Sequence, residues 1–146
     1  MPRTYDRHGI RFSYPEQWEL TEERQPEQIT IGVSNAETTS WNLCLLAHRP
    51  PPRQVLSAAA DAFRDEFSEL DEYDVAADTI GGHRAIGKDL EFFCLELLNS
   101  ASLRVFQTEH YTVLLWWQGT DTELESTRSI LEAITDSLRV VDRHEP

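Results

Sequence analysis

The stretch from Gly81 to Gln118, GGHRAIGKDLEFFCLELLNSASLRVFQTEHYTVLLWWQ, predicts a meander of β-strands. Gly81 and Gly82 suit the turn that opens it, because glycine tolerates the positive backbone angles of a tight hairpin. Three strands are expected after this turn, over residues 84–98, 103–108 and 111–118, and Glu109-His110 is a two-residue link between the last two. Strands joined by links of this length pair in antiparallel fashion.

The segments before the meander alternate apolar and polar residues, as half-buried strands do. Strands are expected over 10–14, 18–20 and 29–33. The next, over 41–48, is apolar on both faces and therefore belongs inside a sheet that is covered on both sides. A further strand is expected over 73–79, and a last short one over 138–141, before a polar tail at 142–146.

Two stretches have helical spacing. Apolar residues form one stripe from Val55 to Leu70, directly after a run of three prolines, and a proline is well placed at the start of a helix. Thr120 and Glu123 are spaced as a capping box for a second helix, whose apolar residues recur from Leu124 to Ile134. The order of elements predicts an α+β fold, with two main helices packed on a mostly antiparallel sheet, in a single domain over 1–146.

A formal charge of −13 in 146 residues argues against several classes of partner. The 13 lysines and arginines are scattered, so no basic cluster is present to bind nucleic acid or an anionic membrane surface. The longest apolar runs, such as 43–47 and 113–117, are far too short to cross a bilayer. The first residues, MPRTYD, lack the apolar stretch of a secretory signal, and a cytoplasmic location is therefore expected.

Acidic residues are concentrated between Asp61 and Asp78, where eight carboxylates accompany a single basic residue, Arg64. One interpretation is a solvated helix face and loop that keep the protein soluble. The other is a docking patch for a basic partner. A calcium loop is disfavoured, because the carboxylates lack the alternating spacing and central glycine of such a loop. The candidate partner-binding residues of this segment are Asp65, Glu66, Glu69 and Glu72.

The two cysteines, Cys44 and Cys94, lie in apolar runs fifty residues apart. With no export signal, both are expected to be reduced and largely buried. No CxxC motif or Cys/His cluster supports zinc or redox chemistry.

No catalytic or cofactor motif is present: the sequence lacks GxSxG, HExxH, a phosphate-binding glycine loop and GxGxxG. The histidines fall in predicted turns, at a strand end and, as His144, in the tail. His110 beside Glu109 lacks the three or four converging ligands of a metal site. Neither an enzyme nor a cofactor or metal site is therefore expected.

Trp116 and Trp117 are adjacent in a predicted strand, so their side chains point to opposite faces of the sheet. If helices cover both faces, both rings are buried. Alternatively, one of them, or Trp41 at a strand start, lines a groove and anchors a protein partner, as exposed aromatic residues on a rigid sheet do.

The opening of the chain resembles the PsbP-like superfamily. The resemblance rests on Tyr5, the run GIRFSYP at 9–15, and Trp18. The central helix, the glycine hairpin, the meander, the capped helix and the closing SLRV at 137–140 agree in outline over nearly the whole chain. The superfamily includes the photosystem II extrinsic subunit P, a nuclear-import factor that binds the Ran GTPase, and bacterial DcrB-like proteins. The resemblance implies an α/β/α sandwich around an antiparallel sheet.

The same resemblance implies a function in binding, since characterised members mostly bind other proteins and some bacterial relatives act as chaperones for secreted effectors. None of their partner-contacting residues can be matched to positions here. The expected function is a soluble, non-enzymatic adaptor or chaperone that binds another protein. The alternative is a small-molecule carrier with an apolar cavity of several hundred Å³ between sheet and helices, whereas a filled interior favours the protein binder.

Overall fold

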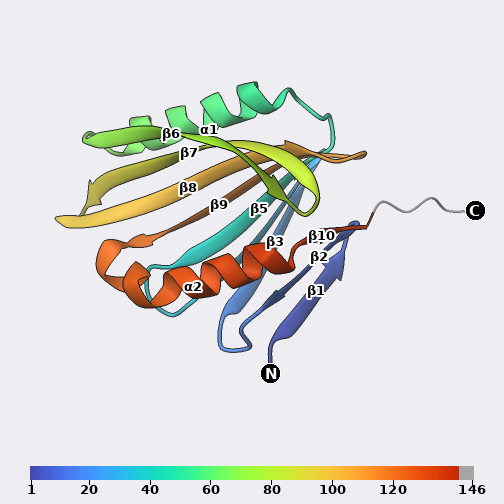
Figure 1. The fold of residues 1–146 in the computed structure, drawn as a ribbon, viewed down its shortest axis with the longest axis horizontal. Helices are drawn as coiled ribbons and strands as arrows, with labels where there is room; N and C mark the ends of the chain where they lie inside the picture. Colours follow the sequence, from blue (N-terminus) through green and yellow to red (C-terminus); the bar gives the residue numbers. More distant parts are fainter. Residues whose placement is uncertain (142–146) are drawn as a thin grey trace, which may run out of the picture.

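Ten strands and two helices make up the part of the chain that the structure describes (Figure 1). The computed structural model describes residues 1–141, and the tail at 142–146, which contains His144, lies outside the described residues. The helices are α1 (Pro52–Glu66) and α2 (Asp121–Ser137). The strands are β1 (Arg3–Arg7), β2 (Ile10–Tyr14), β3 (Glu19–Gln25), β4 (Gln28–Ser34), β5 (Ser40–Leu46), β6 (Leu70–Ile80), β7 (His83–Cys94), β8 (Leu97–Gln107), β9 (Thr112–Thr120) and β10 (Arg139–Val140).

A seven-stranded sheet in the order β3-β4-β5-β9-β8-β7-β6 forms the central layer, and β1-β2-β10 form a small second sheet. All strand pairs described are antiparallel. α1 packs over β7, β8 and β9 on one face of the large sheet, while α2 contacts β8 and β9 on the other face together with β2 (Figure 1). The α+β prediction, with a helix on each side of an antiparallel sheet, is confirmed.

Each face of the sheet has its own core. Beneath α1, Leu56 and Ala60 meet Leu90, Leu103 and Val105 of the sheet. The core on the α2 side is larger and is completed by the small sheet; its members include Phe12, Trp41, Leu43, Leu115 and Leu131. β5 contributes to both faces, as its two-sided apolar pattern predicts.

The helix ends show where local signals hold and where tertiary contacts replace them. At α2, the Thr120 hydroxyl caps the amide of Glu123, as the capping-box spacing predicts. The Glu123 carboxylate, however, does not return to Thr120; it accepts hydrogen bonds from the loop between β4 and β5. α1 ends at Glu66, earlier than the apolar stripe to Leu70 suggests, because Phe67 adopts an extended cap conformation and leads into β6.

One strand is absent from the sequence predictions and one strand prediction is wrong. The sequence analysis expects no strand before residue 10, yet β1 pairs with β2 along its length, with only Tyr5 of its five residues buried. The single strand expected over 84–98 is instead a hairpin. Its chain turns at Leu95-Glu96, and Cys94 pairs with Leu97. The expected break between 98 and 103 lies inside β8.

A bulge in β6 decides which side chains reach the α2 face. The register between β6 and β7 shifts between Val75 and Asp78. Before the bulge, residues with odd numbers such as Tyr73 face α2; after it, Asp78 pairs with Ala85 and shares that face. Without the extra residue, Asp78 would point to the α1 side.

Candidate functional site

Large apolar side chains are exposed at the β7–β8 turn, at the end of the sheet where α1 ends and α2 begins (Figure 1). Leu95 is 90% exposed, Phe93 and Leu97 are each 54% exposed, and Leu98 is 37% exposed. Phe93 and Leu98 face each other across the hairpin on the α2 side of the sheet, and Leu97 pairs with Cys94. We call these four residues, Phe93, Leu95, Leu97 and Leu98, the apolar tip. An exposed apolar group of this kind is a feature of interaction sites.

The turn that carries the apolar tip has an unfavourable backbone for its residues. Leu95 has a φ of 52° and Glu96 a φ of 66°, the left-handed region that a two-residue hairpin turn requires at both positions. Glycine, asparagine and aspartate are the residues that tolerate it, and leucine is not among them. Leu95 is therefore both strained and almost fully exposed, and neither feature stabilises the free protein.

The surroundings of the apolar tip are acidic. Asp89, Glu91 and Glu96 are the charged residues between Asp89 and Leu103, and lysine, arginine and histidine are absent from that stretch. Glu91 lies opposite Asp71 of β6 in the strand register. Like charges opposite each other repel, so this edge of the tip favours a positively charged neighbour.

The three candidate tryptophans lie in different places. Trp41 is fully buried and its Nε1 donates a 2.9 Å hydrogen bond to Thr135, so its ring has no surface to offer a partner. Trp116 and Trp117 are both half-buried on opposite faces of β9. The guanidinium of Arg128 on α2 lies 5.1 Å from the centre of the Trp117 ring, and Trp116 is next to α1 in a groove.

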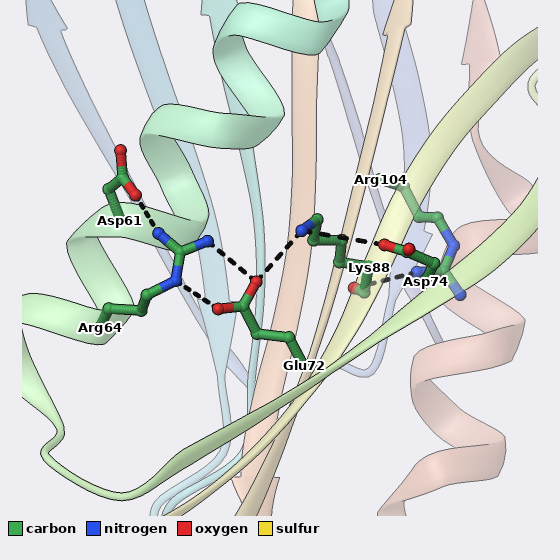
Figure 2. Close-up of polar contacts among 6 residues, drawn as sticks. All are labelled: Asp61, Arg64, Glu72, Asp74, Lys88 and Arg104. Carbon is green, nitrogen blue, oxygen red and sulfur yellow. Dashed lines mark hydrogen bonds and ion pairs between the residues drawn. The ribbon is translucent and has the colours of Figure 1, made fainter.

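The candidate acidic residues divide into two groups. Glu72 belongs to a network: it pairs with Arg64 of α1, which also pairs with Asp61, and its Oε1 accepts a 3.1 Å hydrogen bond from Lys88 of β7 (Figure 2). The Arg64 and Lys88 bonds hold the pKa of Glu72 down at about 2, although partial burial opposes them. Glu72 thus ties α1 to the edge strand and is not a free docking residue.

The other group, Asp65, Glu66 and Glu69, is exposed, and no ion pair to these residues is found in the described part of the chain. These residues lie on α1 and in the link to β6, at the same end of the sheet as the apolar tip. They remain candidates for contact with a basic partner.

The hollows found in the structure are open grooves. One of about 490 Å³ lies between α2 and the N-terminal segments, with Tyr14, Pro15 and Ile130 in its wall. Another, of about 310 Å³, lies between α1 and the sheet, with Phe63 on one side and Trp116 of β9 on the other. Both hollows open to the surface.

In the described residues 1–141, no helix combines the length and apolarity that a membrane span needs. Within the same range, no group of three or more His, Cys, Asp or Glu side chains is arranged so that it could bind a metal ion. Cys44 is buried and Cys94 half-buried, and the two are not joined by a disulfide.

Comparison with known proteins rests on the fold, since no protein-family model and no characterised sequence matches this chain. The cyanobacterial PsbP protein CyanoP of Synechocystis superposes over 95% of this chain and 92% of its own, with a TM-score of 0.63 at 12% identity. The chain has a PsbP-like fold. LpqN of Mycobacterium tuberculosis, which is involved in cell envelope biogenesis, shares this PsbP-like fold over 97% of this chain and 90% of its own, with a TM-score of 0.58 at 16% identity. PA94 of Pseudomonas aeruginosa, of unknown function, has a TM-score of 0.54 at 12% identity over 99% of both chains.

Within the PsbP-like fold, the apolar tip is the feature that the sequence interpretation missed. The sequence pattern predicts that the run from Phe93 to Leu98 lies inside one strand, whose side chains would alternate between the two covered faces of the sheet. A signal was nevertheless present: a strand over 84–98 has 15 residues, whereas strands have about 3–10. Splitting it at Leu95-Glu96 places apolar residues on both sides of an exposed turn.

Proposed function

We propose that this PsbP-like domain is a non-enzymatic protein-binding module, an adaptor or chaperone, and that the apolar tip is its contact surface. The observation that carries the proposal is the exposure of Leu95, at 90%, on a turn whose backbone disfavours leucine. Selection for folding alone would replace it with asparagine or glycine. A leucine at this position is accounted for by burial in a complex.

A partner protein fits the surroundings of the tip better than a lipid surface does. The carboxylates of Glu91 and Glu96 beside the tip would be repelled by anionic lipid headgroups. A protein recess with an apolar floor and a basic rim would match both the leucines and the carboxylates. Asp65, Glu66 and Glu69 at the same end of the sheet would extend the acidic side of this contact.

The test compares two variants in affinity purification from the native cell, followed by measurement with the purified partner. Phe93→Ser with Leu95→Ser removes the apolar tip. Glu109→Ser with His110→Ser alters the exposed turn at the opposite end of the sheet and serves as the control. Loss of the tip should weaken the affinity for the partner at least about tenfold, as for central interface residues, and the control should not.

Three results would overturn the proposal. One is an unchanged set of partners and affinities in the tip variant. Another is binding of the wild type to phosphatidylcholine vesicles that is lost in the tip variant, which would assign the tip to a lipid surface. The third is a small molecule carried through purification by the wild type and seen in native mass spectrometry, which would favour the carrier function.

A further inference from the structure

The hollow of about 310 Å³ between α1 and the sheet is lined by three aromatic residues. Phe63 lies on α1, Phe67 directly follows that helix, and Trp116 lies on β9. Leu103 and Leu114 of the sheet add apolar side chains to the wall. Trp116 is half-buried, so part of its ring surface is open to a ligand in the hollow.

A single carboxylate supplies the charge of this hollow. Among the described residues that line it, Glu66 is the only charged one, and Gln118 adds a neutral amide. Glu66 is exposed, and no ion pair to it is found in residues 1–141. Arg64, two residues earlier, is paired with Asp61 and Glu72 instead (Figure 2). The hollow therefore favours a cationic occupant.

The adjacent tryptophan already has a cation on the other face of β9. The guanidinium of Arg128 lies 5.1 Å from the centre of the Trp117 ring, within the range of a cation–π contact. For Trp116, no lysine or arginine in such a position is found within residues 1–141. Tryptophan is the aromatic side chain that attracts a cation most strongly. This difference between the two rings is independent of the charge of Glu66, and it points to a cation from outside the chain.

The size and chemistry of the hollow fit one arginine side chain. Pockets for drug-sized ligands measure about 300–1,000 Å³, and this hollow lies at the lower end of that range. A guanidinium is flat and weakly hydrated, and it stacks on an aromatic ring while it forms two hydrogen bonds with a carboxylate. A lysine ammonium is strongly hydrated and would lose more of its hydration on entry. Arginine is therefore the cation that matches both the rings and Glu66.

We propose that an arginine side chain of the protein partner occupies this hollow, with its guanidinium stacked on Trp116 and paired with Glu66. This inference rests on the proposed function, because it names one residue of the partner that contacts the apolar tip. Phe67 stacks on Phe92 of β7 with ring centres 4.1 Å apart, and Phe92 precedes Phe93 of the apolar tip. The hollow and the apolar tip are therefore neighbours, and one partner can contact both.

The first test uses three capped peptides that differ only in their central residue. That residue is arginine, lysine or citrulline, which has the shape of arginine without its charge, and serines flank it so that the apolar tip has nothing to bind. Binding to the full chain is followed by NMR through the indole N–H signals of Trp116 and Trp117. The arginine peptide should shift the Trp116 signal, less so at high salt, and leave the Trp117 signal in place. The lysine peptide should bind more weakly, and the citrulline peptide should not bind.

A pair of glutamate variants tests the carboxylate. Glu66→Gln removes the charge of the hollow, and Glu125→Gln makes the same change on the exposed side of α2. Glu66→Gln should weaken binding of the arginine peptide about two- to fivefold, the range for an exposed ion pair, and Glu125→Gln should not. Because both glutamates are exposed, neither variant disturbs the core.

A pair of tryptophan variants tests the ring. Trp116→Leu removes the ring and keeps an apolar side chain, and Trp117→Leu makes the matched change on the opposite face of β9. With the methyl signals of Leu114 as the readout, Trp116→Leu should weaken binding of the arginine peptide about three- to thirtyfold, and Trp117→Leu less than about twofold. The affinities of the two variants for the purified partner should differ in the same direction.

The arginine assignment fails in three cases. Equal binding of the arginine and citrulline peptides would show that the hollow does not recognise charge. Equal effects of Glu66→Gln and Glu125→Gln would place the contact elsewhere on the protein. Tighter binding of tetramethylammonium chloride than of the arginine peptide would assign the hollow to a methylated cation.

The outcomes also distinguish this inference from the proposed function. If the variant without the apolar tip loses the partner while Trp116→Leu and Glu66→Gln keep it at unchanged affinity, only the inference fails. If the variant without the apolar tip keeps its partners while the arginine peptide still shifts the Trp116 signal, only the proposed function of the tip fails.

Discussion

The backbone amide of Thr39, in the loop between β4 and β5, donates a 3.0 Å hydrogen bond to Oε1 of Glu123 in the first turn of α2. Asn35 Nδ2 donates to the same oxygen at 2.6 Å, and the Thr38 hydroxyl donates to Oε2 at 2.8 Å. Burial by itself would raise the pKa of Glu123, but these hydrogen bonds outweigh it and lower the pKa to about 2. One carboxylate thus joins the start of α2 to the β4–β5 loop at one end of the sheet.

Glu123→Gln should destabilise the protein by about 1–3 kcal/mol at neutral pH, the range for hydrogen bonds to a charged group. Because the folded pKa lies near 2 and the ordinary value is 4.5, this stabilisation is complete above about pH 4.5 and is lost as the pH falls through 2. Urea unfolding across that range should show a shallower acid dependence in Glu123→Gln than in wild type. Glu125→Gln, on the exposed side of α2, is the control and should behave as wild type.

Glu72→Gln should cost about 1 kcal/mol, since it breaks the contacts with Arg64 and Lys88. Glu69→Gln makes the same charge change at an exposed position and should stay within about 0.5 kcal/mol of wild type. Added salt should reduce the difference between the two variants in denaturant unfolding. Identical stabilities at low salt would mean that the Arg64–Glu72–Lys88 network does not hold α1 to the edge strand.

Phe63 and Phe67 pack together on Phe92 of β7, with ring centres 5.6 and 4.1 Å from the Phe92 ring. Both rings are half-buried, so Phe63→Ala should lower the free energy of unfolding by about 2–3 kcal/mol. Truncation of a fully buried ring such as that of Phe92 would lower it by about 3–5 kcal/mol. Asp65→Ala, on the exposed side of α1, should change the free energy of unfolding by no more than about 0.5 kcal/mol. Equal effects of Phe63→Ala and Asp65→Ala would contradict this packing of α1.

The two cysteines should differ in reactivity. Burial raises the pKa of the Cys44 thiol, which reduces its thiolate fraction, and Cys94 is more accessible at the base of the apolar tip. A thiol reagent at pH 8 should therefore label Cys94 in the native protein and Cys44 only on unfolding, with mass spectrometry locating the label. Rapid native labelling of both would show that the sheet beside β5 is open.

Replacing the turn Leu95-Glu96 with Asn-Gly should stabilise the protein by about 1 kcal/mol, because these residues tolerate the two positive φ angles. The same change should weaken the affinity for the partner. Thermal unfolding and binding measured on one preparation would give both numbers. A loss of stability would mean that the leucine at this turn contributes to the fold itself.

Periodicity and capping signals were sufficient for most of the fold. The apolar stripe from Val55 placed α1 against the sheet, and Thr120 fixed the start of α2, because both signals depend on residues close together in the sequence. β1 was not predicted, because it forms a strand through its pairing with β2, and the pattern of its own five residues does not indicate one. The turn at Leu95-Glu96 was not predicted, because leucine and glutamate are uncommon at the two positive-φ positions of a two-residue hairpin turn.

The candidate site was predictable only in part, for a related reason. The concentration of carboxylates between Asp61 and Asp78 is visible in the sequence, but the partner of each one is not. Unlike Asp65, Glu66 and Glu69, Glu72 is paired with two cations. Arg64 lies eight residues earlier in the chain, and Lys88 lies on β7, the strand that pairs with β6. The bulge in β6 turns Asp78 toward α2, where it lines a hollow together with Trp117, and the sequence pattern does not show this bulge.

The pairing of β5 with β9 has a consequence for the order in which the chain folds. Leu43 lies opposite Leu115 in that pair, while β6 to β9 pair with their neighbours in sequence. On the ribosome, β3, β4 and β5 emerge before β6 to β9, and the free edge of β5, apolar on both faces, has no partner until β9 has been made. That interval exposes the edge to pairing with other nascent chains, so aggregation during synthesis should depend more on β5 than on any later strand.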